Sequence, residues 1–126
     1  MSVISEVLRQ MPVTRVPMAP TYMAGVINLR GKVTPLLHLD ALLTNEQKYR
    51  YTDKSCIIIC NVCGMNIGLI FDKLHTMYVI DKENINTNVE AYLGSGAEFL
   101  CGMANIDDHL HAIVDPEMIV NKLLTD

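Results

Sequence analysis

The chain has 126 residues, of which 50% are hydrophobic and 19% charged, and its net charge is −4. This composition is typical of a globular protein with one domain, or with two very small lobes around a shared core. The acidic balance and the lack of a basic stripe exclude a nucleic-acid-binding protein. The N-terminus has no basic signal-peptide region and no apolar run could span a bilayer, so membrane insertion is not expected. Four cysteines in such a chain indicate a reducing, cytoplasmic location.

The first element expected in chain order is a short amphipathic helix over residues 3–11. Apolar side chains recur there at helical spacing with polar residues between them, and Pro12 ends the pattern. Residues 13–16 alternate between apolar and polar side chains, which predicts a short strand. Pro17 and Pro20 then mark a loop.

Residues 25–43 predict a β-hairpin that ends in a short helical turn. Two apolar, β-branched runs flank the polar turn Arg30-Gly31-Lys32, where a glycine can supply the positive φ of a tight hairpin. The first run alternates in polarity and predicts a half-buried strand, whereas the second, 33–39, is almost wholly apolar and predicts a buried one. Pro35 cannot donate a ladder hydrogen bond, so it marks an edge or a bulge.

The rest of the chain predicts further short strands and a closing helix. Residues 44–54 are polar and unpatterned like a linker, and residues 81–95 predict a long polar connection with helical fragments. Asp115 and Pro116 suit the N-cap and the first position of a helix. Strands are expected at residues 55–59, 65–71, 74–80, 99–106 and 109–114, the last two forming a hairpin across Asp107-Asp108. Without βαβ alternation, this is a mostly β protein of small barrels or a sandwich, with a short helix near each end.

The cysteines and histidines allow one alternative function, that of a small zinc-binding or thiol-redox protein. Cys60 and Cys63 have the spacing of metal ligands or of a redox pair. A zinc site could be completed by Cys101, His75, His109 and His111. The spacing gives only half of a zinc signature, however, because no second Cys-x-x-Cys follows. Packing in the core or in a turn explains the pair more simply, so we expect no metal and no cofactor.

No motif in the sequence predicts an enzyme, since neither a nucleophile elbow nor a phosphate-binding glycine loop is present. Arg30 is the sharpest single candidate for binding, because a guanidinium at a hairpin tip suits a carboxylate on a partner or on a neighbouring loop. Met11, Met18 and Met23 cluster near the N-terminus and suit an adaptable partner surface, although core filling explains each of them alone.

Several segments together resemble the CheW-like coupling-domain family of bacterial chemotaxis. The most specific is the run from Gly25, Gly-Val-Ile-Asn-Leu-Arg-Gly, followed by Pro35 and Asp40. The other segments agree in order along the chain, and they are residues 13–17, 19–24, 67–72, 99–104 and 115–124. The resemblance covers essentially the whole chain.

The resemblance implies a non-catalytic adaptor that couples chemoreceptor tips to the regulatory domain of the histidine kinase CheA. Family members fold as two small five-stranded β-barrels over a shared core. The groove between the barrels and the segment around residues 25–30 would face the receptor, and a face of the first barrel would bind the kinase's own CheW-like domain. The implied partner-binding residues are Gly25, Asn28 and Arg30, together with Ile4 and Val7.

One departure from the family pattern concerns its N-terminal hairpin. Residues 3–8 resemble only the last part of that motif, so the first barrel is expected to be incomplete and copies to self-associate through it. The chain is then a single CheW-like domain over residues 1–126, with the first barrel at about 1–45, the second at 55–114 and a helix over 115–126 that returns to the first. A fragment of a longer protein, such as a kinase C-terminal domain or a receiver-fused coupling protein, stays open.

Overall fold

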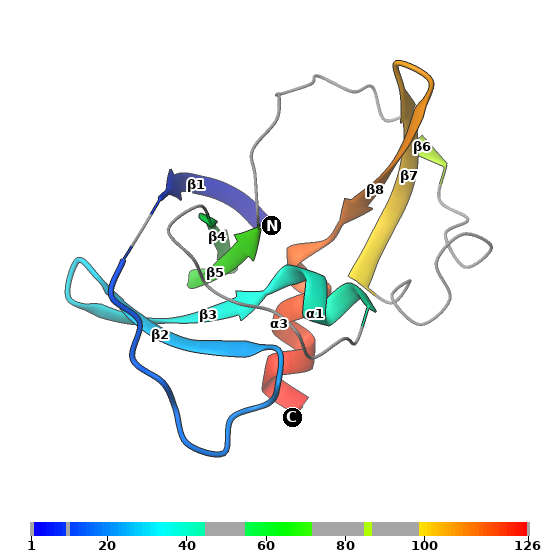
Figure 1. Ribbon diagram of the computed structural model, residues 1–126. Helices are drawn as coiled ribbons and strands as arrows, with labels where there is room; N and C mark the ends of the chain where they lie inside the picture. The colour runs from blue at the N-terminus through cyan, green and yellow to red at the C-terminus, as the bar shows by residue number, and fades with distance from the viewer. Residues whose placement is uncertain (1, 10, 45–54, 72–84, 87–98, 126) are drawn as a thin grey trace.

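A computed structural model describes residues 2–9, 11–44, 55–71, 85–86 and 99–125. The described part is mostly β, as the sequence predicts, and forms two sheets (Figure 1). Its elements are β1 (Ser2–Leu8), β2 (Met23–Leu29), β3 (Lys32–His38), α1 (Leu39–Thr44), β4 (Cys56–Val62), β5 (Met65–Phe71), β6 (Ile85–Asn86), β7 (Leu100–Ile106), β8 (His109–Val114) and α3 (Pro116–Thr125).

The larger sheet has five strands in the order β1-β4-β5-β3-β2, so β1 and β2 are its two edges. Neighbouring strands are antiparallel except β3 and β5, which run parallel where Leu36–His38 pair with Gly68–Ile70. Pro35 lies just before this parallel pairing begins, so β3 has one neighbouring strand there and the missing N–H is tolerated. The smaller sheet, β6-β7-β8, is antiparallel and extends away from the larger one (Figure 1).

The predicted helix over residues 3–11 is wrong, because residues 2–8 form strand β1 against β4. The apolar spacing that suggested a helix has another cause. A β-bulge between Ile4 and Glu6 inserts one residue, so the side-chain alternation changes phase at Ser5. The hydroxyl of Ser5 donates a hydrogen bond to the carbonyl of Ile59 across the pair at 3.2 Å. Long-range pairing of β-branched residues therefore overrides the local helical pattern.

Residues 13–16, predicted as a strand, make only one isolated bridge, in which Thr14 pairs with Val26 on the outer edge of β2. Two backbone hydrogen bonds form this bridge, from the Thr14 N–H to the Val26 carbonyl at 2.9 Å and from the Val26 N–H to the Thr14 carbonyl at 2.8 Å. The segment after β1 thus covers part of the β2 edge.

The larger sheet buries apolar side chains on both faces. One face carries Ile27, Leu29, Leu36, Ile57, Ile59 and Ile70, with Leu8, Met11, Val13 and Ala24 packed against them. The other face carries Leu37, Cys60, Val62, Ile67 and Leu69, and it packs against α1, α3, Tyr22 and Phe99. Because both faces are covered, β4 and β5 read as nearly continuous apolar runs instead of alternating ones.

Gly68 allows close side-chain packing on the first of these faces, because it has no Cβ. An added Cβ would lie 2.8 Å from the Leu36 Cδ1 and 3.3 Å from the Ile57 Cγ2. We expect Gly68→Ala to lower the free energy of unfolding by about 1–3 kcal/mol, since extra volume in a packed core forces neighbours off their rotamers. Urea denaturation checks this, and the paired variant Gly68→Ala with Leu36→Val should recover part of the loss. A loss below 0.5 kcal/mol (roughly the level of a surface change) would contradict the tight packing.

Three hairpins in the described part of the chain close through two residues that both have positive φ, as in type I′ turns. These pairs are Arg30 (49°) with Gly31 (83°), Cys63 (50°) with Gly64 (87°), and Asp107 (51°) with Asp108 (63°). The predicted hairpins over residues 25–43 and 99–114 are therefore confirmed, including the helical turn α1 and the Asp-Asp turn.

The C-terminal helix begins where the sequence predicts. The Asp115 carboxylate accepts a hydrogen bond from the Glu117 N–H at 3.0 Å, and Pro116 takes the first helical position. Ile119 and Val120 are buried against the five-stranded sheet. The Asp115 N–H also donates to the Phe99 carbonyl at 2.8 Å, which ties the start of the helix to the start of the β7–β8 hairpin.

Some sequence predictions lie outside the described residues. They are the strand at 74–80, the linker at 44–54 apart from Thr44, which ends α1, and most of the polar connection 81–95, of which residues 85–86 form β6. The five-stranded sheet takes strands from both sides of the expected division near residue 50, β1–β3 before it and β4–β5 after it. The number of barrels and the boundary between them stay predictions.

Candidate partner-binding surface

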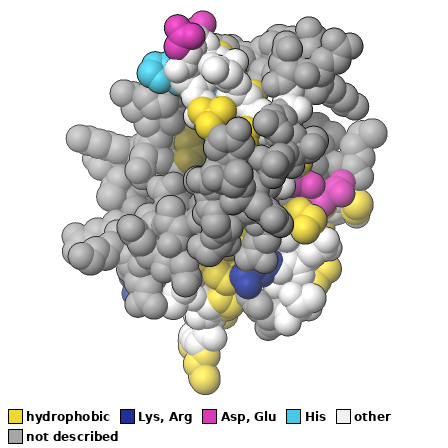
Figure 2. Space-filling view, turned by 90° about the vertical axis from the view of Figure 1, so that its right-hand side faces the viewer, with side chains coloured by type: hydrophobic (Ala, Val, Ile, Leu, Met, Phe, Trp, Pro, Cys, Tyr) yellow, Lys and Arg dark blue, Asp and Glu magenta, His cyan; other side chains and the backbone are white. Residues whose placement is uncertain are grey.

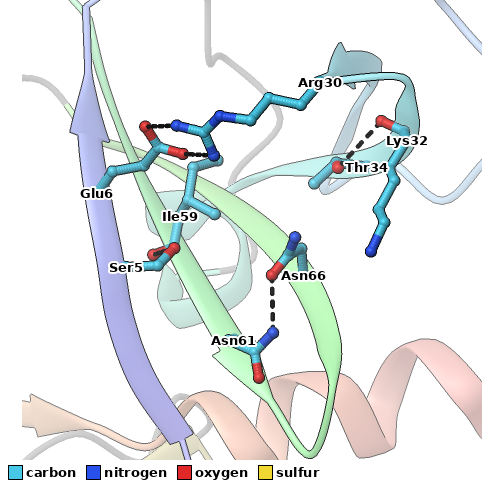
Figure 3. A network of polar contacts seen from close by, with 8 residues as sticks. All are labelled: Ser5, Glu6, Arg30, Lys32, Thr34, Ile59, Asn61 and Asn66. Carbon is cyan, nitrogen blue, oxygen red and sulfur yellow. Dashed lines mark hydrogen bonds and ion pairs between the residues drawn. The ribbon is translucent and has the colours of Figure 1, made fainter.

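The tip of the β2–β3 hairpin reaches across to β1. The Arg30 guanidinium contacts both carboxylate oxygens of Glu6, with Nη1 2.8 Å from Oε1 and Nη2 donating to Oε2 at 3.0 Å (Figure 3). Because β1 and β2 are opposite edges of the sheet, this bidentate pair joins the two edges. Arg30 thus meets a carboxylate on a neighbouring element, one of the two arrangements that its position allows.

The Glu6–Arg30 pair contributes little to the stability of the fold. The Arg30 side chain is 76% exposed and the Glu6 side chain 22% exposed, so solvent screens the attraction, and such pairs contribute about 1 kcal/mol or less. Holding a residue other than glycine at φ 49° costs about 1 kcal/mol, which offsets that gain. What the pair does is to fix the direction of an exposed cation beside β1.

Asn28 shapes the turn that presents Arg30. Its side-chain oxygen accepts a hydrogen bond from the Gly31 N–H at 2.8 Å. In the β4–β5 turn the side-chain oxygen of Asn61 likewise accepts a hydrogen bond from the Gly64 N–H at 3.2 Å. Cys63 occupies the turn position that corresponds to Arg30. The repeated Asn-x-x-Gly pattern gives Asn28 a turn-forming role, and any contact of its own with a partner stays a prediction.

Gly25 is buried and lets the segment after β1 approach β2. Its φ is 151°, and an added Cβ would lie 2.3 Å from the Thr14 carbonyl oxygen and 2.9 Å from the Val13 Cγ1. The structure gives Gly25 this packing role, whereas the role in receptor coupling that the family resemblance implies stays a prediction.

Ile4 and Val7 lie on β1, and their side chains are 62% and 47% exposed. Ile4 and Val7 lie opposite Cys60 and Ile58 of β4, whereas Glu6 lies opposite Ile59, so the exposed apolar side chains leave the other face of β1 from Glu6. We call Ile4, Glu6, Val7, Asn28 and Arg30 the β1–hairpin surface. The structure thus places Asn28 and Arg30 on the hairpin that meets β1, places Ile4 and Val7 on the other face of β1 from Glu6, and leaves Gly25 in the interior.

Sequence reasoning missed Glu6 as a functional candidate. The residue was placed on the polar side of a helix that does not form. The available signal was that Arg30 suits a carboxylate on a neighbouring segment and that Glu6 is the single acid among residues 2–8.

The zinc or thiol-redox alternative finds no support in the described residues. Cys60 is buried in the core, and this burial raises the pKa of its thiol. Cys63 is exposed in the β4–β5 turn and Cys101 is exposed on β7. No group of three or more metal-ligating side chains is assembled in the described part of the chain, which does not include His75.

Desolvation, followed by the charge of Asp115, raises the pKa of the Cys101 thiol. The thiolate is the reactive form, so alkylation of Cys101 at pH 8 should be slower than that of an unperturbed thiol and should increase as the pH rises. Asp115→Asn keeps a good N-cap but removes the charge, and should therefore accelerate alkylation. Iodoacetamide labelling followed by mass spectrometry measures the rates, and equal rates in both proteins would contradict the electrostatic contribution.

Among the described residues, no helix is long and apolar enough to cross a membrane.

Comparison with known proteins assigns the class. The sequence model of the CheW-like domain family matches residues 1–124, so the chain belongs to this family. The family consists of chemotaxis scaffold adaptors and is not catalytic. The fold agrees, since the crystal structure of the scaffolding protein TtCheW from Thermoanaerobacter tengcongensis superposes with a TM-score of 0.78 at 30% identity. That match covers 89% of this chain and 75% of TtCheW.

Curated relatives point the same way. The chain is 30% identical over 109 residues to the chemotaxis protein CheW of Bacillus subtilis, covering 86% of this chain and 69% of that protein. It is 29% identical over 119 residues to a probable chemotaxis protein CheW of Rhizobium etli, covering 94% and 76%. Against the CheW of Treponema pallidum, at 25% identity, the match covers 79% of this chain but spans only 61% of the relative's length.

Proposed function

We propose that this protein is a non-catalytic adaptor of a chemotaxis pathway that couples chemoreceptors to a CheA-type histidine kinase in the cytoplasm. The family assignment over residues 1–124 supports the adaptor role, and the relatives are named as chemotaxis proteins. The observation that carries the proposal within the molecule is the bidentate Glu6–Arg30 pair. It holds a cation in a defined direction beside β1, at little gain in stability.

The β1–hairpin surface has the composition of a protein-binding site. Arg30 is a residue type enriched at energetic centres of interfaces, and its pairing with Glu6 lowers the entropy lost when a partner binds. Ile4 and Val7 supply exposed apolar area on the other face of the same edge strand, which a partner that covers the edge can also contact. In this proposal the surface faces the receptor, and the kinase regulatory domain occupies a different face.

The proposal is tested by a pull-down with two partners from the same organism. The immobilised regulatory domain of the CheA-type kinase should retain this protein, and a soluble receptor cytoplasmic fragment should join the complex only when this protein is present. Free receptor fragment and kinase domain without the adaptor form the control. Failure to retain the protein on the kinase domain would remove the adaptor proposal.

We also propose that copies associate through the free edge of β1. In the described strands β1 has one neighbour, β4, and its outer face carries the exposed Ile4 and Val7. An unpaired strand edge with apolar side chains is a template for pairing with another strand.

Val7→Lys should block this association, because a lysine on an edge strand opposes pairing with a second strand. Sedimentation velocity at high concentration is expected to give a dimer for the native protein and a monomer for Val7→Lys. Leu110→Lys is the matched control, since Leu110 is similarly exposed (53%) but lies on β8. A native protein that stays monomeric would overturn the self-association.

A further inference from the structure

A groove of about 630 Å³ opens between the loop that precedes β2 and the ends of β2 and β3. Backbone hydrogen bonds shape its wall, from the Met23 N–H to the Pro20 carbonyl at 3.0 Å and from the His38 N–H to the Tyr22 carbonyl at 2.7 Å. The described residues that line it include Arg15, Val16, Met18, Met23 and His38. We call this the loop groove.

The rim of the loop groove exposes apolar side chains. Met18 is fully exposed and sits at φ 61°, where few residues with a side chain are found, and Val16 is 40% exposed. Figure 2 shows a hydrophobic side chain protruding at the bottom of the molecule, the end at which Figure 1 places the loop between β1 and β2. Two of the three clustered methionines, Met18 and Met23, thus line one groove, whereas Met11 packs into the core.

The charge of the loop groove is the opposite of that of the whole protein. Among the described residues, Arg15 lines it, no acidic residue does, and no carboxylate pairs with Arg15. The whole chain carries −4. An unopposed guanidinium beside flexible thioethers suits an occupant that carries a carboxylate next to an apolar side chain.

The loop groove is separate from the β1–hairpin surface. It lies at the Met23–Ala24 end of β2, whereas Arg30 follows the other end, six residues further along. Six residues of strand span about 20 Å. One partner can therefore occupy the groove while another contacts Arg30.

We propose that the loop groove binds an extended acidic segment of a protein partner, with a carboxylate on Arg15 and an apolar side chain against Met18. The groove would then be a second partner-binding site of the adaptor, so this inference rests on the proposed function. The side chains of Arg15 and Met18 are both exposed, so both can be changed without altering the core.

Nuclear magnetic resonance with defined peptides tests the proposal. Acetyl-Glu-Leu-Glu-Leu-amide, titrated into the labelled protein, should shift the amide signals of residues 13–24 and His38, and added salt should reduce the shifts. The matched peptide acetyl-Lys-Leu-Lys-Leu-amide should leave them unchanged. Equal shifts with both peptides, or none with the acidic one, would overturn the assignment.

Variants separate charge from fold. Arg15→Glu should weaken binding of the acidic peptide at least tenfold, whereas Arg9→Glu, the same change at an exposed arginine outside the groove, should leave it unchanged. Met18→Ser should weaken binding by a smaller factor, and Leu124→Ser, at another exposed apolar residue, should not. Equal losses for Arg15→Glu and Arg9→Glu would overturn the role of the groove.

Two further outcomes are distinguishable. If the acidic peptide binds the groove but the kinase domain and receptor fragment do not bind the protein, the adaptor function fails and the groove stands. If sedimentation shows self-association that Arg15→Glu abolishes, the occupant is a second copy. The proposal of a separate partner is then overturned.

Discussion

Gly25→Ala is expected to lower the free energy of unfolding by about 3 kcal/mol, the upper end of the range expected for Gly68→Ala. An alanine Cβ would lie 2.3 Å from the Thr14 carbonyl oxygen, which is backbone and cannot rotate away. This clash can be relieved only if the Thr14–Val26 bridge breaks or the whole segment after β1 moves away from β2. The left-handed φ of 151° adds to the cost for any residue with a side chain.

Urea denaturation of Gly25→Ala measures the loss, with Gly31→Ala as the matched control. Gly31 also has a positive φ, of 83°, but no atom lies within 4 Å of an added Cβ, so its substitution should cost about 1 kcal/mol. If the two variants lose equal stability, the close approach of Thr14 to β2 is not what requires a glycine at position 25.

Arg30→Glu is expected to weaken assembly with the chemoreceptor at least tenfold while changing the free energy of unfolding by about 1 kcal/mol or less. The variant places a carboxylate beside Glu6, which breaks the bidentate pair and replaces a cation with an anion on the β1–hairpin surface. Both effects follow from the exposure of Arg30 to solvent. Solvent weakens the ion pair, so its loss changes stability little, and the same exposure leaves the guanidinium accessible to a partner.

Lys32→Glu is the control for Arg30→Glu, because Lys32 is exposed on the same hairpin and the charge change is the same. The charge swap Glu6→Arg with Arg30→Glu separates two roles of Arg30. The swap restores binding if the pair serves to connect the hairpin to β1, and it does not if the partner contacts the guanidinium itself. Unchanged receptor binding by Arg30→Glu would show that the site is assigned wrongly.

The local chemistry of the sequence was sufficient to predict the hairpins and the C-terminal helix. The β2–β3 and β7–β8 turns and the helix start at Asp115 depend on residues within a few positions of one another. Positive φ at turn residues and N-capping are local effects, so they can be recognised without the fold.

The N-terminal strand could not be predicted in the same way. The apolar spacing of residues 3–8 fits a helix, and only the pairing with β4, more than fifty positions away, together with a bulge at Ser5, makes it a strand. The same limit applies to Glu6, whose contact with Arg30 spans 24 positions and depends on the relative positions of the two sheet edges. The packing role of Gly25 likewise requires the position of Thr14.

The central claim is tested most directly by reconstituting receptor control of the kinase. Autophosphorylation of the CheA-type kinase is measured with receptor-containing membranes, with and without this protein. We expect receptor-dependent stimulation of the kinase to require the native protein and to fall by at least tenfold with Arg30→Glu, while Lys32→Glu supports it. Kinase activity that responds to receptor equally well without this protein, or with Arg30→Glu in its place, would contradict the account.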